Sequence, residues 1–200
     1  MIYDLTLAIN KKISIFPGDP KLEITQSATI EKDGYNEKRI SFNTHFGTHI
    51  DFPQHMLKDG KTLSDYPIEK FIGKGIVLDA KDKNINEINL DKIKKDDFVF
   101  FYTGHIDKIY SDNFFKESPT LSKEFTKKLV EKEISIIGLD SYSPDNAPYE
   151  IHKILLKNDI LIVENLVNLD KLIGKRFTCY IAPLHIEHSD GSPCRVIALI

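Results

Sequence analysis

The chain has 200 residues, a length that suits one α/β domain better than two. Hydrophobic residues make up 41% of it, charged residues 28%, and the formal net charge is -3, so no basic excess points to nucleic acid or to an anionic membrane surface. No apolar run approaches the roughly 20 residues that cross a bilayer, and the start of the chain does not resemble a signal peptide. Together with two cysteines that form no motif, these features predict a cytoplasmic protein.

The first quarter of the chain predicts strands and one loop. Residues 2–9 are expected to form a strand, and residues 13–20 a loop, because Pro17, Gly18 and Pro20 interrupt regular structure. Residues 21–30 alternate apolar and polar, as a half-buried strand does. Residues 37–44 are its expected hairpin partner, with Asp33-Gly34 supplying the turn.

Apolar runs later in the chain alternate with helical patterns. The expected strands cover residues 75–79, 98–103, 134–140, 160–164, 177–182 and 196–200. Helices are expected over residues 122–133, which Ser122 can cap, and over residues 147–156. Antiparallel strands followed by alternating strands and helices favour a single α/β domain over residues 1–200 with a mixed sheet.

Ligand-type side chains cluster within eleven residues at the positions His45, His49, Asp51 and His55. Imidazole and carboxylate are ligands of Zn²⁺ and Mn²⁺. A shared ion requires a turn between His45 and His49, since four residues of extended strand would separate their Cα atoms by roughly 13 Å. Gly47 can permit that turn, and Pro53 can end the next extended stretch and bring the chain back. The segment therefore predicts a metal site.

Two more candidate ligands lie far along the chain. His152 falls in the second predicted helix, and Glu164 ends an apolar strand, where side chains face the usual crevice of an open α/β sheet. Taken alone, both residues could equally be solvent-facing.

The segment His45–His55 resembles the HxGTHxDxPxH signature of the cyclase-like hydrolases, which include bacterial kynurenine formamidases and isatin hydrolases. Further segments are similar to other motifs of this family: residues 16–19 (FPGD), 102–104 (YTG), 138–141 (GLDS), 182–184 (APL) and 190–195 (DGSPCR). The resemblance extends over nearly the whole chain. It implies a swivelling β/β/α fold and a homodimer or homotetramer, in which residues near the N-terminus can reach a neighbouring subunit's site.

The resemblance also implies roles for individual residues. His45, His49 and Asp51 match ligands of a first metal ion, His152 and Glu164 match two further ligands, and His55 matches the catalytic histidine. One or two ions, Zn or Mn, are then expected in each subunit. Phe16 stands where kynurenine formamidases usually carry tryptophan, so it is expected either to stack on an aromatic substrate or to pack in the core.

These expectations favour a metal-dependent hydrolase of C–N bonds other than peptide bonds. The first candidate is an arylformamidase that converts N-formyl-L-kynurenine to kynurenine and formate, with a metal-activated water as nucleophile and His55 as proton shuttle. The absence of a G-x-S-x-G motif argues against a serine hydrolase. Alternatives are an isatin-type or other cyclic-amide or lactone hydrolase, a non-catalytic metal or small-molecule binding protein, and a structural domain without metal.

Overall fold

Eight strands form one mixed sheet in the computed structural model, which describes residues 1–200. The spatial order is β1-β10-β4-β8-β7-β6-β5-β9, and β10 also pairs with β9. The ring from β4 through β9 and β10 therefore closes on itself, with β1 added beside β10. The bounds are β1 Ile2–Asp4, β4 His49–Asp51, β5 Ile72–Asp79, β6 Phe98–Tyr102, β7 Ile136–Leu139, β8 Leu161–Glu164, β9 Arg176–Pro183 and β10 Gly191–Leu199.

Alternation along the strands separates two apolar clusters. On β6, Phe98 and Phe100 point into the cluster enclosed by the ring, whereas Val99 and Phe101 point outward. The outward side chains pack against helices α2, Lys123–Glu131, and α3, Glu150–Lys157. Strands β5 to β8 are parallel to one another, and β4, β9 and β10 run antiparallel to their neighbours. The predicted α/β class with a mixed sheet is confirmed.

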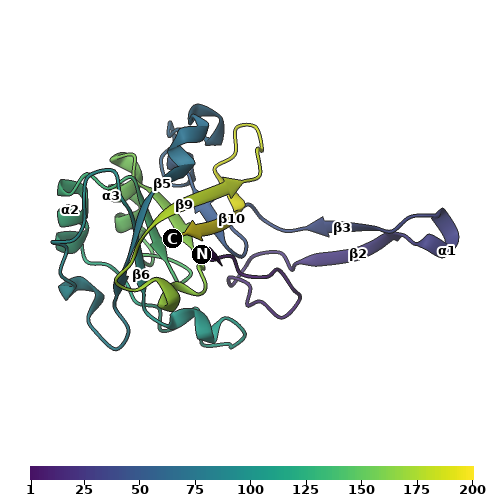
Figure 1. Cartoon of the computed structure of the whole chain (residues 1–200). Helices are drawn as coiled ribbons and strands as arrows, with labels where there is room; N and C mark the ends of the chain where they lie inside the picture. The colour runs from purple at the N-terminus through teal and green to yellow at the C-terminus, as the bar shows by residue number, and fades with distance from the viewer.

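A two-stranded ribbon projects from this body (Figure 1). Strands β2, Glu23–Ala28, and β3, Glu37–Ser41, form the predicted hairpin, which we call the arm. The connection is longer than predicted, because a helical turn, α1 Ile30–Asp33, lies at the tip and Gly34 ends it with a left-handed φ of 79°. The predicted half-burial of β2 is wrong for the single chain, since four of its six residues are exposed.

The other predicted elements are present with shifted ends. The first strand is shorter than residues 2–9, whereas β10 begins five residues before the predicted strand at residue 196. Ser122 caps α2 as predicted by accepting a hydrogen bond from the backbone N–H of Phe125. Helix α3 begins at Glu150 rather than at residue 147, since Tyr149 has a left-handed φ of 60°. No helix combines the length and the apolar character that crossing a membrane requires.

Candidate metal centre and active-site cavity

The short strand β4 directs two candidate ligands to one side. His49 and Asp51 are two residues apart and share the outer face, whereas Ile50 points into the enclosed core. On the neighbouring strand, Glu164 lies directly opposite His49 in the antiparallel register. The Nε2 atom of His49 is 3.3 Å from Asp51 Oδ1 and 3.3 Å from Glu164 Oε2. Strand pairing thus brings a histidine and two carboxylates from distant parts of the chain together.

Two bends bring the other histidines of this segment to the same place. Gly47 has a φ of 64°, which permits the predicted turn, and His45 Nδ1 lies 2.7 Å from Asp51 Oδ1. Pro53 begins a 3₁₀ turn, Pro53–His55, that carries His55 back over the site. The rings of His45 and His55 overlap, with centroids 3.8 Å apart. Both predicted bends are therefore present, and they bring the histidines together.

Helix α3 closes the cluster from the other side. Its residue His152 is buried, and its Nε2 lies 3.5 Å from Glu164 Oε1 and 3.8 Å from Asp51 Oδ2. The solvent-facing alternative for His152 and Glu164 is wrong, because both side chains are buried. The five residues predicted as ligands are thus brought together, while their role as ligands stays a prediction.

Each of the three proposed histidine ligands has a hydrogen-bond acceptor at the ring nitrogen that faces away from the shared carboxylates. The acceptors are the Gly47 carbonyl oxygen for His49 (2.9 Å), Asp145 for His152 (2.5 Å) and Asp190 for His45 (3.0 Å). A proton held at that nitrogen leaves the opposite nitrogen free to act as a ligand. This is the arrangement that metal-binding histidines require.

The electrostatics of the cluster favour positive charge. Burial by itself lowers the pKa of His45, but the Asp51 charge and the hydrogen bonds with Asp190 and Asp51 outweigh it and raise that pKa to about 9. The same balance holds for His152: burial disfavours its charged form, but the hydrogen bond with Asp145 and the nearby Glu164 carboxylate raise its pKa to about 10. Burial also disfavours charge on Asp51, yet the His45 and His49 rings hold its pKa well below the usual value.

Three observations test whether a divalent cation fits these residues. Glu164 Oε1 is buried and has no hydrogen-bond partner, which is costly unless another group neutralises it. Ligand atoms at about 2 Å from one tetrahedral ion lie about 3.3 Å apart, and both contacts of His49 Nε2 have this length. His45, His49 and Asp51 also form one of three side-chain groups whose ligand atoms are close enough to share an ion. The donor set therefore fits a cation such as Zn²⁺ or Mn²⁺.

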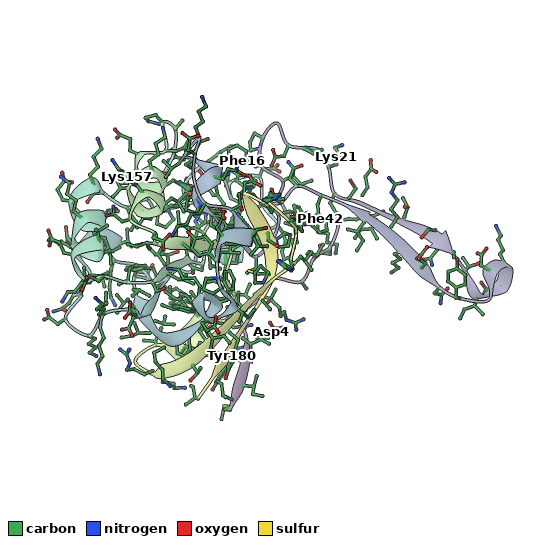
Figure 2. The ribbon with its side chains drawn as sticks, turned by 90° about the horizontal axis from the view of Figure 1, so that it is seen from above. Asp4, Phe16, Lys21, Phe42, Lys157 and Tyr180 are labelled. Atoms are coloured by element: carbon green, nitrogen blue, oxygen red, sulfur yellow. The ribbon has the colours of Figure 1, made fainter.

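The cluster lies at the base of a cavity of about 700 Å³, a size typical of sites for small molecules. Aromatic side chains form much of its wall: Phe16, Phe42, Phe46, Phe114, Phe115, Tyr142 and Tyr149. The Phe16 ring is 5.5 Å from that of Phe115, edge to face, and 6.0 Å from that of Tyr142. Phe16 is 42% exposed, so it is not a core residue, and it lies with Phe42 on the side of the body that carries the arm (Figure 2).

Two carboxylates in this site were not among the predicted site residues. Asp190 touches His45, lies 3.6 Å from Nδ1 of His55 and accepts a hydrogen bond from the Thr44 hydroxyl. Asp145 contacts His152 and is buried. In the sequence, Asp190 belongs to a family-like motif without an assigned role, and Asp145 belongs to no motif. His105 does not join this cluster, because its ring stacks on that of Phe114 and its Nε2 is hydrogen-bonded to the Phe114 carbonyl oxygen.

Known proteins resemble the chain over nearly its whole length. It is 33% identical to the uncharacterized protein MJ0783 of Methanocaldococcus jannaschii, with 92% of each chain covered, and 29% identical to kynurenine formamidase of Bacillus cereus, with 97% and 95% covered. A solved structure of a potential metal-dependent hydrolase with cyclase activity superposes with a TM-score of 0.81 at 27% identity, covering 99% of this chain and 96% of that one. Isatin hydrolase A of Labrenzia aggregata shares the fold, with a TM-score of 0.89 at 24% identity and coverage of 100% and 93%. The family described as "Putative cyclase" matches residues 3–146, and the chain belongs to this cyclase family.

Proposed function

We propose that the protein is a metal-dependent amide hydrolase that converts N-formyl-L-kynurenine to kynurenine and formate. One observation carries the proposal: imidazoles and carboxylates converge at the base of a cavity whose wall is aromatic. The similarity to kynurenine formamidase of Bacillus cereus supports the choice of substrate.

His45, His49 and Asp51 would hold a first Zn²⁺ or Mn²⁺ ion, and His152 and Glu164 would complete this ion's shell or hold a second ion with Asp51. The bound cation supplies Lewis-acid chemistry toward the amide carbonyl and the attacking water. The protein contributes the fixed placement of these side chains: His49, Asp51, His152 and Glu164 are buried, and hydrogen bonds orient the rings of His49 and His152 before any substrate enters.

His55 serves as the proton shuttle. Its side chain is 26% exposed, and its Nδ1 faces Asp190, which leaves Nε2 available for proton exchange with water and substrate. We propose that it first accepts a proton from the attacking water and then donates one to the leaving amine. Its stacking on His45 holds the ring next to the centre where the bond is cleaved.

The aromatic wall selects the substrate. The aryl ring of N-formylkynurenine is flat, and Phe16, Phe115 and Tyr142 offer faces and edges against which such a ring packs favourably. Because Phe16 is partly exposed and lines the cavity, it can contact a ligand without any rearrangement of the core.

A second candidate function is hydrolysis of isatin or another cyclic amide or lactone. The shared fold with isatin hydrolase A favours it, and an aromatic wall suits a fused bicyclic substrate equally well. The metal chemistry and the role of His55 would be the same for both substrates.

The decisive experiment combines metal analysis with two substrates. Protein purified without chelator is analysed for bound metal and then assayed with N-formylkynurenine and with isatin, beside a His49→Ala variant and a control variant at the exposed His188. Turnover of N-formylkynurenine by the parent and the control, but not by His49→Ala, supports the proposal. Turnover of isatin alone selects the second candidate, and bound metal without turnover of any amide or lactone indicates a binding protein.

We further propose that the protein is a homodimer or homotetramer in which the arm contacts a second copy. A two-stranded ribbon is at best marginally stable alone in water, and the arm exposes large apolar side chains: Ile30, Tyr35 and Ile40 are 60%, 56% and 51% exposed. Sedimentation of the intact chain and of an Ile40→Lys variant tests this, because a charge within the contact should shift the protein toward the monomer.

A further inference from the structure

A buried carboxylate in the loop before helix α3 makes two hydrogen bonds of different kinds. Asp145 is 7% exposed. Its Oδ2 accepts the backbone N–H of Ile151 at 2.6 Å, in the first turn of α3, and its Oδ1 lies 2.5 Å from Nδ1 of His152. One side chain thus connects the beginning of the helix to an imidazole of the proposed metal centre.

We propose that Asp145 is a positioning residue that keeps a proton on Nδ1 of His152, so that the unprotonated Nε2 faces the metal. The inference rests on the proposed metal centre. An ionised carboxylate can only accept hydrogen bonds, so the nitrogen beside it has to carry the proton. The opposite nitrogen, Nε2, points to Glu164 and Asp51. Asp145 therefore determines which nitrogen is the ligand.

Helix capping alone does not require an acid at this position. Asn and Ser are as good as Asp at accepting the free backbone N–H groups of a first helical turn. An amide, however, has one acceptor oxygen and one donor nitrogen. If its oxygen keeps the Ile151 bond, its NH₂ group faces Nδ1 of His152 and favours the tautomer that is protonated at Nε2. Only a carboxylate serves both neighbours at once.

The neighbouring histidines use other acceptors for the same purpose. The acceptor of His49 is a backbone carbonyl, which substitution cannot remove, and the acceptor of His45 is Asp190, which is 38% exposed and also adjoins His55. Asp145 is buried and contacts His152 alone among the site histidines. It is the position at which orientation of a ligand can be tested without touching the ligand or the proton shuttle.

The test is the Asp145→Asn variant, freed of metal by chelator and titrated with Mn²⁺ and Zn²⁺. We expect the affinity to fall about 10- to 100-fold, the usual effect of removing a partner of a ligating histidine. Asp97→Asn is a matched control, because Asp97 is also buried, accepts the backbone N–H of Lys94 at 2.7 Å and bonds a second side chain, Arg176. The Asp97→Asn variant should lose stability and keep the metal affinity of the parent.

Each result decides the matter. If Asp145→Asn binds metal as the parent does, even with lower stability, Asp145 only caps the helix and the inference is wrong. If the parent itself binds neither ion, the proposed metal centre fails and the inference fails with it. If the variant does not fold, the zinc-loaded parent provides the answer: ¹⁵N NMR should show His152 protonated at Nδ1, and protonation at Nε2 would overturn the proposal.

Discussion

Substituting Gly191 tests the metal centre through a contact with one ligand. Gly191 is the first residue of β10 and lies opposite Asp51 in the register with β4. A Cβ atom at this position would lie 2.4 Å from Cε1 and 2.7 Å from Nε2 of His45. The backbone of Gly191 is not in the left-handed region, so alanine itself is compatible with the strand. The effect of Gly191→Ala should therefore fall on the imidazole.

The size of this effect follows from the two distances. Ordinary contacts of a Cβ atom begin at 3.4 Å, so the His45 ring has to retreat by about 1 Å. Metal sites tolerate shifts of about 0.2 Å in a ligand distance, and a displacement of about 1 Å at a reacting centre costs on the order of 100-fold in rate. We expect metal affinity to fall at least about 10-fold and kcat/KM about 100-fold.

Calorimetric titration measures the metal affinity, a steady-state assay measures kcat/KM, and urea unfolding of the metal-free protein measures any change in stability. The control is Gly75→Ala, whose Cβ would lie 2.3 Å from the Phe177 ring in the enclosed core. Overpacking there should cost about 1–3 kcal/mol of stability and leave metal affinity unchanged. A Gly191→Ala variant that binds metal and turns over substrate like the parent would refute the assignment of His45.

Three further predictions concern the shuttle, the loop after β6 and the metal. His55→Ala should keep its metal content in mass spectrometric analysis and lose about 100-fold or more in kcat; unchanged kcat would contradict the proposed role. Asp140→Asn should lower the free energy of unfolding in urea by about 1–3 kcal/mol. The Asp140 carboxylate accepts hydrogen bonds from the backbone N–H groups of Thr103 and Gly104, whereas the NH₂ group of asparagine would place a donor against these donors. Metal at about 100 times its Kd should stabilise the fold by about 2.7 kcal/mol and raise Tm by about 5–10 °C over chelated protein; equal Tm values would argue against a metal site.

Local patterns predict much of the second half of the fold, where apolar runs and amphipathic helices alternate. The closure of the sheet was beyond such reasoning, since β10 pairs with β4 and β1, which lie far away in the sequence, and long-range pairing leaves no local mark. The alternation of β2 predicts half-burial, yet alternation shows only that the two faces of a strand differ. Burial also needs a covering surface, which this chain alone does not supply for the arm.

The candidate site was likewise only partly predictable from the sequence. The arrangement from His45 to His55 could be predicted, because the reach of the backbone requires turns where Gly47 and Pro53 stand. Asp145 and Asp190 could not be assigned roles, because an acceptor for an imidazole N–H can come from any part of the chain. Their contribution appears only when the fold places them at the outer nitrogens of His152 and His45.

The enclosed core itself positions the charged groups of this site. Ile50 and Val163 are register partners, both fully buried in the core, and burial of each contributes about 1.5–3 kcal/mol. Slipping either strand by one residue would remove that residue from the enclosed core and turn an ionisable side chain, His49 or Glu164, into the apolar interior, where an unpaired charge is far more costly. The register that buries the apolar residues is therefore the one that presents His49, Asp51 and Glu164 together on the outer face. The geometry of the proposed metal centre thus derives its precision from packing on the opposite face of the same two strands.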